Sequence, residues 1–331
     1  MHILLVKTSS LGDVIHNLPV VSDLARRFPG VVVDWVVEEA FADIARLHPA
    51  VRRVIPVAVR RWRRRLLAPQ TWREMREFRR LVRAERYEAV LDTQGLVKSG
   101  LIASLARGPH LGHAAASARE PLAARFYDRS FSIPKELHAV ERNRRLAADA
   151  LAYTLTSPLD YGIHAPPLAA AWLPATPYAV LLTATSRADK EWPEHYWLDL
   201  GRALGEIGLR CILPAGSTAE RERAARLATA LDGAQSGAIA APPLGIRELA
   251  GLMAGARIVI GVDTGLTHLA AALDRPTIAL FCGSDPRLTG VFAGDRAINL
   301  GTIGAAPAAR DRKSTRLNSS HLGRSRMPSS A

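Results

Sequence analysis

The chain has 331 residues, a length that suits two domains of ordinary size. Hydrophobic residues make up 48% and charged residues 23%, which is a globular composition and excludes a wholly disordered or fibrous protein. Two cysteines, Cys211 and Cys282, are too few for a disulfide framework or a cysteine metal site. Because the sequence also lacks an apolar run of about 20 residues and a signal-peptide pattern, we expect a cytoplasmic protein.

The net charge of +13 is unevenly distributed along the chain. Residues 1–150 carry 26 Lys and Arg against 16 Asp and Glu, whereas residues 151–309 carry 12 against 14. Residues 310–331 add 6 basic residues and 1 acidic residue. The basic excess of the first half predicts that this half meets an anionic partner.

Short β-branched runs alternate with helical patterns through the first half. Continuous apolar runs such as ILLV and VVVDWVV are typical of strands covered on both faces, so we expect a parallel sheet with helical crossovers. In chain order, the pattern predicts a strand at 2–7, a helix at 13–28, a strand at 31–37, a helix at 39–47, a strand at 51–59, a helix at 69–86 and a strand at 87–92.

A Pro-rich stretch at 165–177 interrupts this alternation and is predicted to be a linker. The alternation then resumes, with strands predicted at 178–183, 209–214, 257–262 and 276–281, and helices at 194–207, 219–231, 246–256 and 265–273. We therefore expect an α/β fold of two Rossmann-like, doubly wound domains, 1–164 and 178–309. In such folds ligands bind at the carboxyl ends of the strands, which predicts a central cleft between the domains.

The last segment, 310–331, does not continue this pattern, since it has few apolar residues and no periodicity. Such a composition predicts a disordered tail. The segment also resembles translated sequencing adapter, so we expect a foreign tail that replaces the end of a truncated second domain.

Three segments that follow predicted strands carry the residue types of an anion-binding site. In KTSSLGD at 7–13, Gly12 and the small hydroxyl side chains let a substrate approach the backbone, and Asp13 either faces the cleft or caps the helix. In the second segment, 183–193, Lys190 and several hydroxyls suit a phosphate, although a solvated loop remains the alternative. In GVDTGLTH at 261–268, a helix starts directly after the strand, which suits a diphosphate, with N-capping as the alternative.

The sequence RRWRRR at 60–65 opens a segment to Arg86 that holds 11 Arg and 3 Glu. Clustered arginines recognise phosphates and carboxylates, and beside a tryptophan they also suit an anionic membrane surface. The alternative is a solvated helix face. We expect such a face for the arginines further along the segment: Arg76, Arg79, Arg80 and Arg83. The sequence contains no G-x-G-x-x-G after a strand, no Walker loop and no metal-ligand spacing.

Taken together, these segments resemble the lipopolysaccharide heptosyltransferases of glycosyltransferase family 9, in particular the ADP-heptose:Kdo transferases. Eight segments in register over about residues 1–300 carry the resemblance: VKTSSLGDV at 6–14, DWVVEEAF at 34–41, RVIPVAVRRWRR at 53–64, DTQGLVKS at 92–99, AREPLAARFY at 118–127, HAVER at 138–142, DKEWPEHYW at 189–197 and VDTGLTHLAAALDRP at 262–276.

The resemblance implies a GT-B fold without cofactor or metal, and an inverting transfer of L-glycero-D-manno-heptose from ADP-heptose to the first Kdo sugar of Kdo2-lipid A. It implies that Asp13 is the general base, that Lys190 neutralises the departing diphosphate, and that the enzyme is peripheral on the cytoplasmic face of the inner membrane. The implied donor-binding residues are Thr185, Ser186, Lys190, Glu220, Leu244, Asp263, Thr264, Gly265 and His268. The implied acceptor-binding residues are Ser10, Gly12, Arg60, Arg61, Arg63, Arg64, Lys98 and Arg119.

Two of the donor positions depart from the family pattern, because Ser186 stands where we expect Thr and Leu244 where we expect Met. Both changes keep the character of the side chain. One alternative function is that of a sister heptosyltransferase with another inner-core acceptor. The other is a non-catalytic binder of nucleic acid or anionic membrane, which the absence of a recognised nucleic-acid-binding motif disfavours. We therefore expect no nucleic-acid partner.

Overall fold

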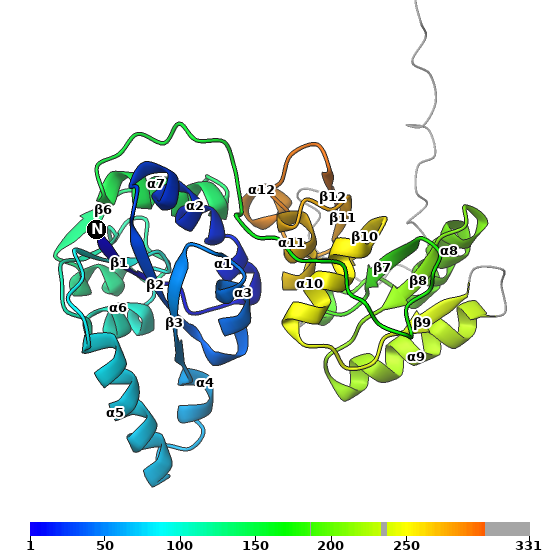
Figure 1. Ribbon diagram of the computed structural model, residues 1–331, viewed down its shortest axis with the longest axis horizontal. Coiled ribbons are helices and arrows are strands. Elements are labelled where there is room, and N and C mark those ends of the chain that lie inside the picture. Colours follow the sequence, from blue (N-terminus) through cyan, green and yellow to red (C-terminus); the bar gives the residue numbers. More distant parts are fainter. Residues whose placement is uncertain (186, 233–236, 302–331) are drawn as a thin grey trace, which may run out of the picture.

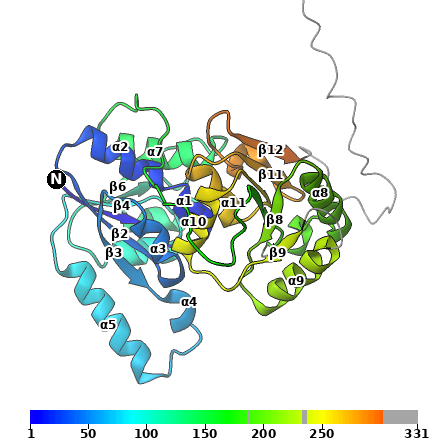
Figure 2. The same ribbon diagram turned by 45° about the vertical axis from the view of Figure 1, so that its right-hand side comes forward.

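The computed structural model describes residues 1–185, 187–232 and 237–301. Ser186 and the tail 310–331 therefore lie outside the described residues, as do the last positions of the predicted second domain, 302–309. The chain forms two parallel sheets of six strands, one in each half (Figure 1). Helices cover both faces of each sheet (Figure 2). The predicted fold class, a pair of doubly wound α/β sheets, is confirmed.

The first sheet has the strand order β3-β2-β1-β4-β5-β6, the order of a Rossmann-like fold. Its strands are β1 (His2–Val6), β2 (Val32–Glu38), β3 (Val51–Val57), β4 (Ala89–Asp92), β5 (His110–His113) and β6 (Arg129–Phe131). Its α-helices are α1 (Leu11–Ile15), α2 (Leu18–Arg27), α3 (Ala42–Arg46), α4 (Val59–Trp62), α5 (Pro69–Arg83), α6 (Val97–Ala103) and α7 (Ala139–Ala150). Two 3-10 helices are η1 (Glu39–Phe41) and η2 (Pro121–Phe126).

The second sheet repeats this arrangement, with the order β12-β11-β10-β7-β8-β9. Its strands are β7 (Tyr178–Leu182), β8 (Arg210–Leu213), β9 (Ala238–Ala240), β10 (Ile258–Val262), β11 (Thr277–Phe281) and β12 (Ala297–Gly301). Its helices are η3 (Ala188–Lys190), α8 (Glu194–Glu206), α9 (Thr218–Asp232), α10 (Ile246–Gly255), α11 (Gly265–Ala272) and α12 (Pro286–Thr289). Residues 165–177, the predicted linker, contain no helix or strand.

Two predicted elements of the first half are wrong in detail. The predicted helix at 13–28 is two helices, because Pro19 has no N–H to donate and its ring clashes with the carbonyl four residues earlier. Proline is favourable only in the first turn, and α2 therefore starts next to it. The predicted strand at 51–59 ends at Val57, and the remaining residues enter the short helix α4.

The hydrophobic core is continuous between the two halves. One buried cluster contains Ile3 and Leu5 of β1, Val14 of α1, Leu269 of α11 and Leu182 of β7. The opposite face of each sheet has its own buried cluster. Because α1 follows β1 and α11 follows β10, this shared core brings the carboxyl ends of both sheets together. Among the described residues, no helix has the length and apolar character needed to span a bilayer.

A buried ion pair fixes α2 against α7 in the first half. Nε of Arg144 donates to Oδ2 of Asp23 at 2.7 Å, and Nη2 donates to Oδ1 at 2.8 Å. The side chains are only 8% and 2% exposed. The hydroxyl of Ser157 adds a third contact to Oδ1 at 2.6 Å. Removal of the guanidinium would leave the carboxylate buried without its charged partner.

We expect Arg144→Met to lower the free energy of unfolding by about 3–5 kcal/mol, the usual cost of breaking a buried ion pair. The matched control is Arg145→Met, one residue further along α7, where the side chain is exposed and the expected change is within about 0.5 kcal/mol. Urea unfolding of both variants, followed by circular dichroism, makes the comparison. An equal decrease in the free energy of unfolding in the two variants would contradict this account of the ion pair.

Candidate active site

A cavity of about 390 Å³ lies between the two halves, where the loop after β1 faces the loop after β10. It is lined by residues that are far apart in the sequence but were predicted to belong to one site. The predicted residues that line it are Ser10, Gly12, Asp13, Arg60, Arg119, Thr185, Lys190, Asp263, Thr264, Gly265 and His268. The tertiary structure therefore brings together most of the predicted donor and acceptor residues.

Asp13 lies in the first turn of α1, and its side chain is 17% exposed. Its Oδ2 accepts a hydrogen bond from the Ser10 N–H at 2.9 Å and pairs with Nη1 of Arg119 at 3.3 Å. Asp13 therefore caps its helix and also faces the cavity, so the two roles predicted for it from the sequence are compatible. Burial alone would raise the pKa of this carboxyl, but the charges of Lys7 and Arg119 lower it to about 2. Asp13 is thus a carboxylate at neutral pH.

Two further buried side chains, neither of them among the predicted site residues, hold the loop that carries Asp13. Gln94 accepts from the Thr8 N–H at 2.7 Å and donates to the Ser9 carbonyl at 2.9 Å. Lys7 donates to the carbonyl of Thr93 at 3.0 Å. The motif DTQG starts at the last residue of β4 and lies at the same sheet edge as the end of β1. This position is the sequence feature that could have indicated Gln94.

Asp263, at the end of β10, organises the donor side of the cavity. Its Oδ2 accepts from Nζ of Lys190 at 2.5 Å and from Oγ of Ser284 at 2.5 Å. Its backbone carbonyl accepts from Oγ1 of Thr185 at 3.0 Å. Burial would raise the pKa of Asp263, but these donors and His268 lower it well below its usual range. The ammonium group of Lys190 is therefore held at the cavity wall by a permanent carboxylate.

The helix α11 starts directly after this carboxylate, with Thr264 as its N-cap residue. The first backbone N–H groups of a helix have no partner within the helix and favour an anion. Gly265 is required here, because a Cβ atom at this position would lie 2.5 Å from Cγ of Leu11 in α1. The close approach of α1 and α11 thus places the N-termini of both helices at one cavity.

A pair of histidines that also line the cavity joins the two halves. Nε2 of His16 lies 3.1 Å from Nδ1 of His268, and both side chains are buried. Burial and the neighbouring His268 and His138 lower the pKa of His16 well below its usual value. His16 is therefore neutral at neutral pH. No sequence pattern indicated a role for His16, since its contact with His268 depends on how the two halves pack.

Glu220 lies in a neighbouring cavity of about 510 Å³, which shares Thr185 with the first and also contains Trp192. Its Oε2 accepts from the N–H groups of Gly216 and Ser217 at 2.9 and 3.0 Å. Leu244 lines neither of these two cavities and packs against the large core instead. Ser186 lies outside the described residues.

The remaining predicted acceptor residues do not line the first cavity. Arg61 forms ion pairs with Glu39 and Glu74, at 2.9 and 2.7 Å. Arg63 and Arg64 are exposed beyond α4. Nζ of Lys98 donates to Oγ of Ser9 at 2.9 Å, and burial lowers the pKa of its ammonium group.

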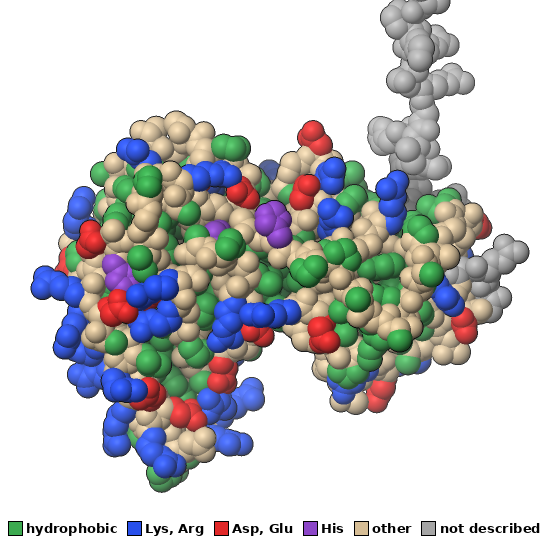
Figure 3. All heavy atoms as spheres, in the orientation of Figure 1, with side chains coloured by type: hydrophobic (Ala, Val, Ile, Leu, Met, Phe, Trp, Pro, Cys, Tyr) green, Lys and Arg blue, Asp and Glu red, His purple; other side chains and the backbone are tan. Residues whose placement is uncertain are grey.

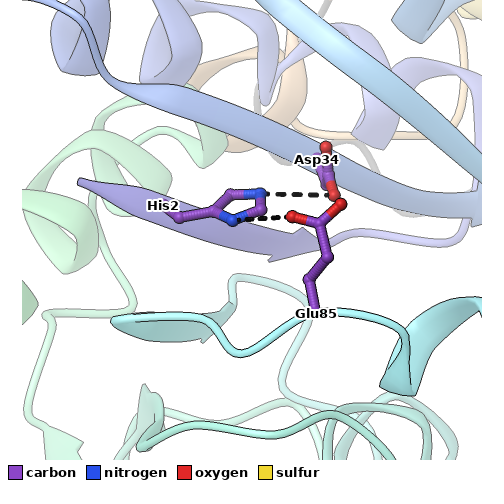
Figure 4. A group of neighbouring side chains, drawn as sticks. All are labelled: His2, Asp34 and Glu85. Carbon is purple, nitrogen blue, oxygen red and sulfur yellow. Dashed lines mark ion pairs between the residues drawn. The ribbon is translucent and has the colours of Figure 1, made fainter.

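One group of side chains outside the cavity has the geometry of a metal site among the described residues. His2, Asp34 and Glu85 lie together at the amino end of the first sheet, away from the cavity (Figure 4). Nη2 of Arg52 already donates to both Asp34 and Glu85, at 2.7 and 2.8 Å. Burial would raise the pKa of Asp34, but Arg52, Tyr87 and Arg53 lower it. The group is therefore an ion-pair cluster that ties β1, β2 and the end of α5 together.

Comparisons with known proteins identify relatives that cover most of the chain. A model of glycosyltransferase family 9 (heptosyltransferase) matches residues 75–318. Lipopolysaccharide heptosyltransferase 1 of Pseudomonas aeruginosa is 48% identical over 91% of this chain and 84% of its own length.

Two solved structures of the E. coli heptosyltransferase WaaC are also similar. The structure with ADP has a TM-score of 0.83 and 44% identity over 90% of this chain and 92% of that one. The structure with ADP-2-deoxy-2-fluoro heptose has a TM-score of 0.79 and 42% identity, over 91% of this chain and 93% of that one. Because the family model and these relatives cover most of the sequence, the chain belongs to glycosyltransferase family 9, the heptosyltransferases of lipopolysaccharide biosynthesis.

Proposed function

We propose that this enzyme transfers L-glycero-D-manno-heptose from ADP-heptose to the first Kdo sugar of Kdo2-lipid A, with inversion at the anomeric carbon. The observation that carries the proposal is the position of the Asp13 carboxylate in the same cavity as Lys190 and the start of α11. A base and a diphosphate site on opposite walls suit a displacement in which the acceptor attacks from one side and ADP leaves from the other.

On the donor side, Lys190 and the N–H groups of Thr264 and Gly265 stabilise the negative charge that develops on the departing diphosphate. Asp263 keeps Lys190 in place and accepts hydrogen bonds from sugar hydroxyls. His268 lines the same cavity and interacts with the carboxylate of Asp263. Glu220, with Trp192 in the adjoining cavity, binds the nucleoside. The second half, 178–309, is thus the proposed donor domain.

On the acceptor side, Asp13 removes the proton from the attacking hydroxyl as the bond to the anomeric carbon forms. Ser10 and Gly12 leave room for the sugar beside it. The arginines Arg60, Arg61, Arg63 and Arg64, with Lys98 and Arg119, meet the phosphates and carboxylates of the acceptor. The first half, 1–164, is thus the proposed acceptor domain, joined to the donor domain by the linker 165–177.

We further propose that the enzyme works on the cytoplasmic face of the inner membrane. It contacts the membrane through residues 63–72, here called the tip, which join α4 to α5 and include the first turn of α5. Figure 3 shows Lys and Arg side chains gathered over this lower end of the first half. Leu67 is 98% exposed, and Leu66 and Trp72 are about half exposed. Nε1 of Trp72 donates to the Leu66 carbonyl at 2.8 Å and holds the tip in shape. Exposed apolar side chains among arginines suit an anionic lipid surface.

We expect Asp13→Asn to lower the rate of heptose transfer by about 10²–10⁴-fold, the usual scale for a general base. The amide keeps the shape of the carboxylate, so the affinity for ADP-heptose should not change. The measurement is a radiolabelled transfer assay with Kdo2-lipid A, with the exposed Asp149→Asn as control. Undiminished transfer would rule out Asp13 as the base. Faster transfer to a heptosylated core than to Kdo2-lipid A would identify the sister activity instead.

We expect Gly265→Ala to weaken ADP binding by about 5- to 150-fold, since overpacking costs about 1–3 kcal/mol and the added methyl group pushes α1 from α11. The control is Gly294→Ala, because a Cβ atom at Gly294 would meet no atom within 4 Å. Isothermal titration of ADP into both variants provides the measurement. Wild-type affinity in Gly265→Ala would contradict the proposed diphosphate site.

We expect Leu67→Asp to reduce binding to vesicles with anionic lipids by tenfold or more, because one apolar side chain contributes about 1.5–3 kcal/mol when it is buried. The control is Ile207→Asp, which changes a side chain that is 71% exposed in the second half. Vesicle cosedimentation at two salt concentrations measures the effect. An equal reduction in both variants would exclude the tip as the membrane contact.

A further inference from the structure

A second, smaller cavity of about 160 Å³ lies on the other side of Asp13. It shares Asp13, Arg119 and Thr289 with the main cavity, so the base stands between the two. The other charged side chains that line it are all basic: Lys7, Lys135 and Arg142. With Arg119, four cations therefore face one carboxylate around a space that is too small for a nucleotide.

The cations of this cavity have few anionic partners. Lys7 is 5% exposed, and its Nζ donates only to neutral oxygens, the Thr93 carbonyl at 3.0 Å and Oδ1 of Asn143 at 3.3 Å. Burial lowers the pKa of Lys7 to about 8. Burial and the charge of Arg119 also lower the pKa of Arg142, against a smaller opposing effect from Glu136. A buried cation such as Lys7, or a half-buried one such as Arg142, gains stability when an anion joins it.

Besides Nδ1 of His113, two buried polar atoms at the cavity have no hydrogen-bond partner among the described residues. They are Oγ1 of Thr93, whose side chain is 1% exposed, and Nε of Arg142. Buried polar groups in folded proteins almost always have partners, so such atoms indicate a ligand. Both are donors, as are Lys7 and Arg119, and a carboxylate offers acceptors only. Nη2 of Arg142 donates to the Ser117 carbonyl at 2.6 Å, which fixes the direction of the guanidinium.

We propose that this cavity is a subsite for the carboxylate of the acceptor sugar, and that Arg142 and Lys7 are its main contacts. The proposal rests on the function proposed above. The cavity touches Asp13 directly, so its anion must belong to the same sugar as the reacting hydroxyl. In the proposed acceptor this group is the carboxylate of the first Kdo sugar, whereas the phosphates belong to the more distant lipid A.

The subsite also links acceptor binding to the strength of the base. Lys7 and Arg119 hold the pKa of Asp13 low while no anion faces them. A bound carboxylate offsets these two charges and raises the proton affinity of Asp13. The base therefore becomes stronger when the correct acceptor is in place, which favours sugars that carry an acid group over neutral ones.

The test compares a synthetic acceptor with a single Kdo sugar and the methyl ester of the same acceptor. For the wild-type enzyme, we expect esterification to lower kcat/KM by tenfold or more. In Arg142→Gln this preference should fall to less than threefold, and Arg142→Lys should recover part of it. The control Arg145→Gln, an exposed residue three positions along α7, should keep the full preference. Circular dichroism of each variant checks that it is folded.

Equal transfer to acid and ester by the wild-type enzyme would overturn the subsite and leave the proposed function intact. A full preference in Arg142→Gln would overturn the role of Arg142. If the wild-type enzyme transferred to neither acceptor, the proposed function would fail. NMR titration with the methyl glycoside of Kdo and with its methyl ester would then test the subsite. Binding of the acid but not of the ester, lost in Arg142→Gln, would support the subsite. Equal binding of the acid and the ester would overturn it.

Discussion

The close approach of two short helices, α1 and α11, is the contact on which the rest of the structure depends. It needs a residue without a Cβ atom at Gly265, because Leu11 occupies that space. The buried pair His16 and His268 and the continuous apolar core then hold the two halves together. Since each helix starts at the carboxyl end of a central strand, this one contact places Asp13 in the same cavity as Lys190 and the start of α11. Chemistry that needs groups from both halves is thereby possible.

The electrostatics of the two walls of the cavity differ in a way that fits the two anionic substrates of the proposed reaction. On the donor wall, Lys190 is paired with Asp263, so the charge there is nearly balanced and the helix N-terminus provides the remaining attraction. On the acceptor wall, Lys7, Arg119 and Arg142 outnumber Asp13. This surplus of positive charge keeps Asp13 ionised, and it is offset only when an anion binds. The uneven charge of the sequence is therefore in keeping with the proposed division of binding between the halves.

Much of the fold could be predicted because the central strands are long and apolar, and parallel sheets bury such strands on both faces. The short strands β5 and β6, at one end of the first sheet, could not be predicted in this way. HLGH of β5 and RSF of β6 contain few apolar residues, and they become strands only because β4 and then β5 offer free backbone groups beside them. Pro19 divided the first predicted helix, a local rule that the apolar periodicity of 13–28 concealed.

The sequence by itself determined the two α/β halves, the loops after β1 and β10, and the types of residue that these loops carry, because short-range patterns and strand ends fix them. It also determined the family, through motifs in register. Only the tertiary structure decided that Asp13 both caps its helix and faces the cavity, and that His16 meets His268. It alone brought Lys7, Thr93 and Arg142 around one small cavity. These contacts join residues up to 252 positions apart, and no local pattern encodes a distance of that kind.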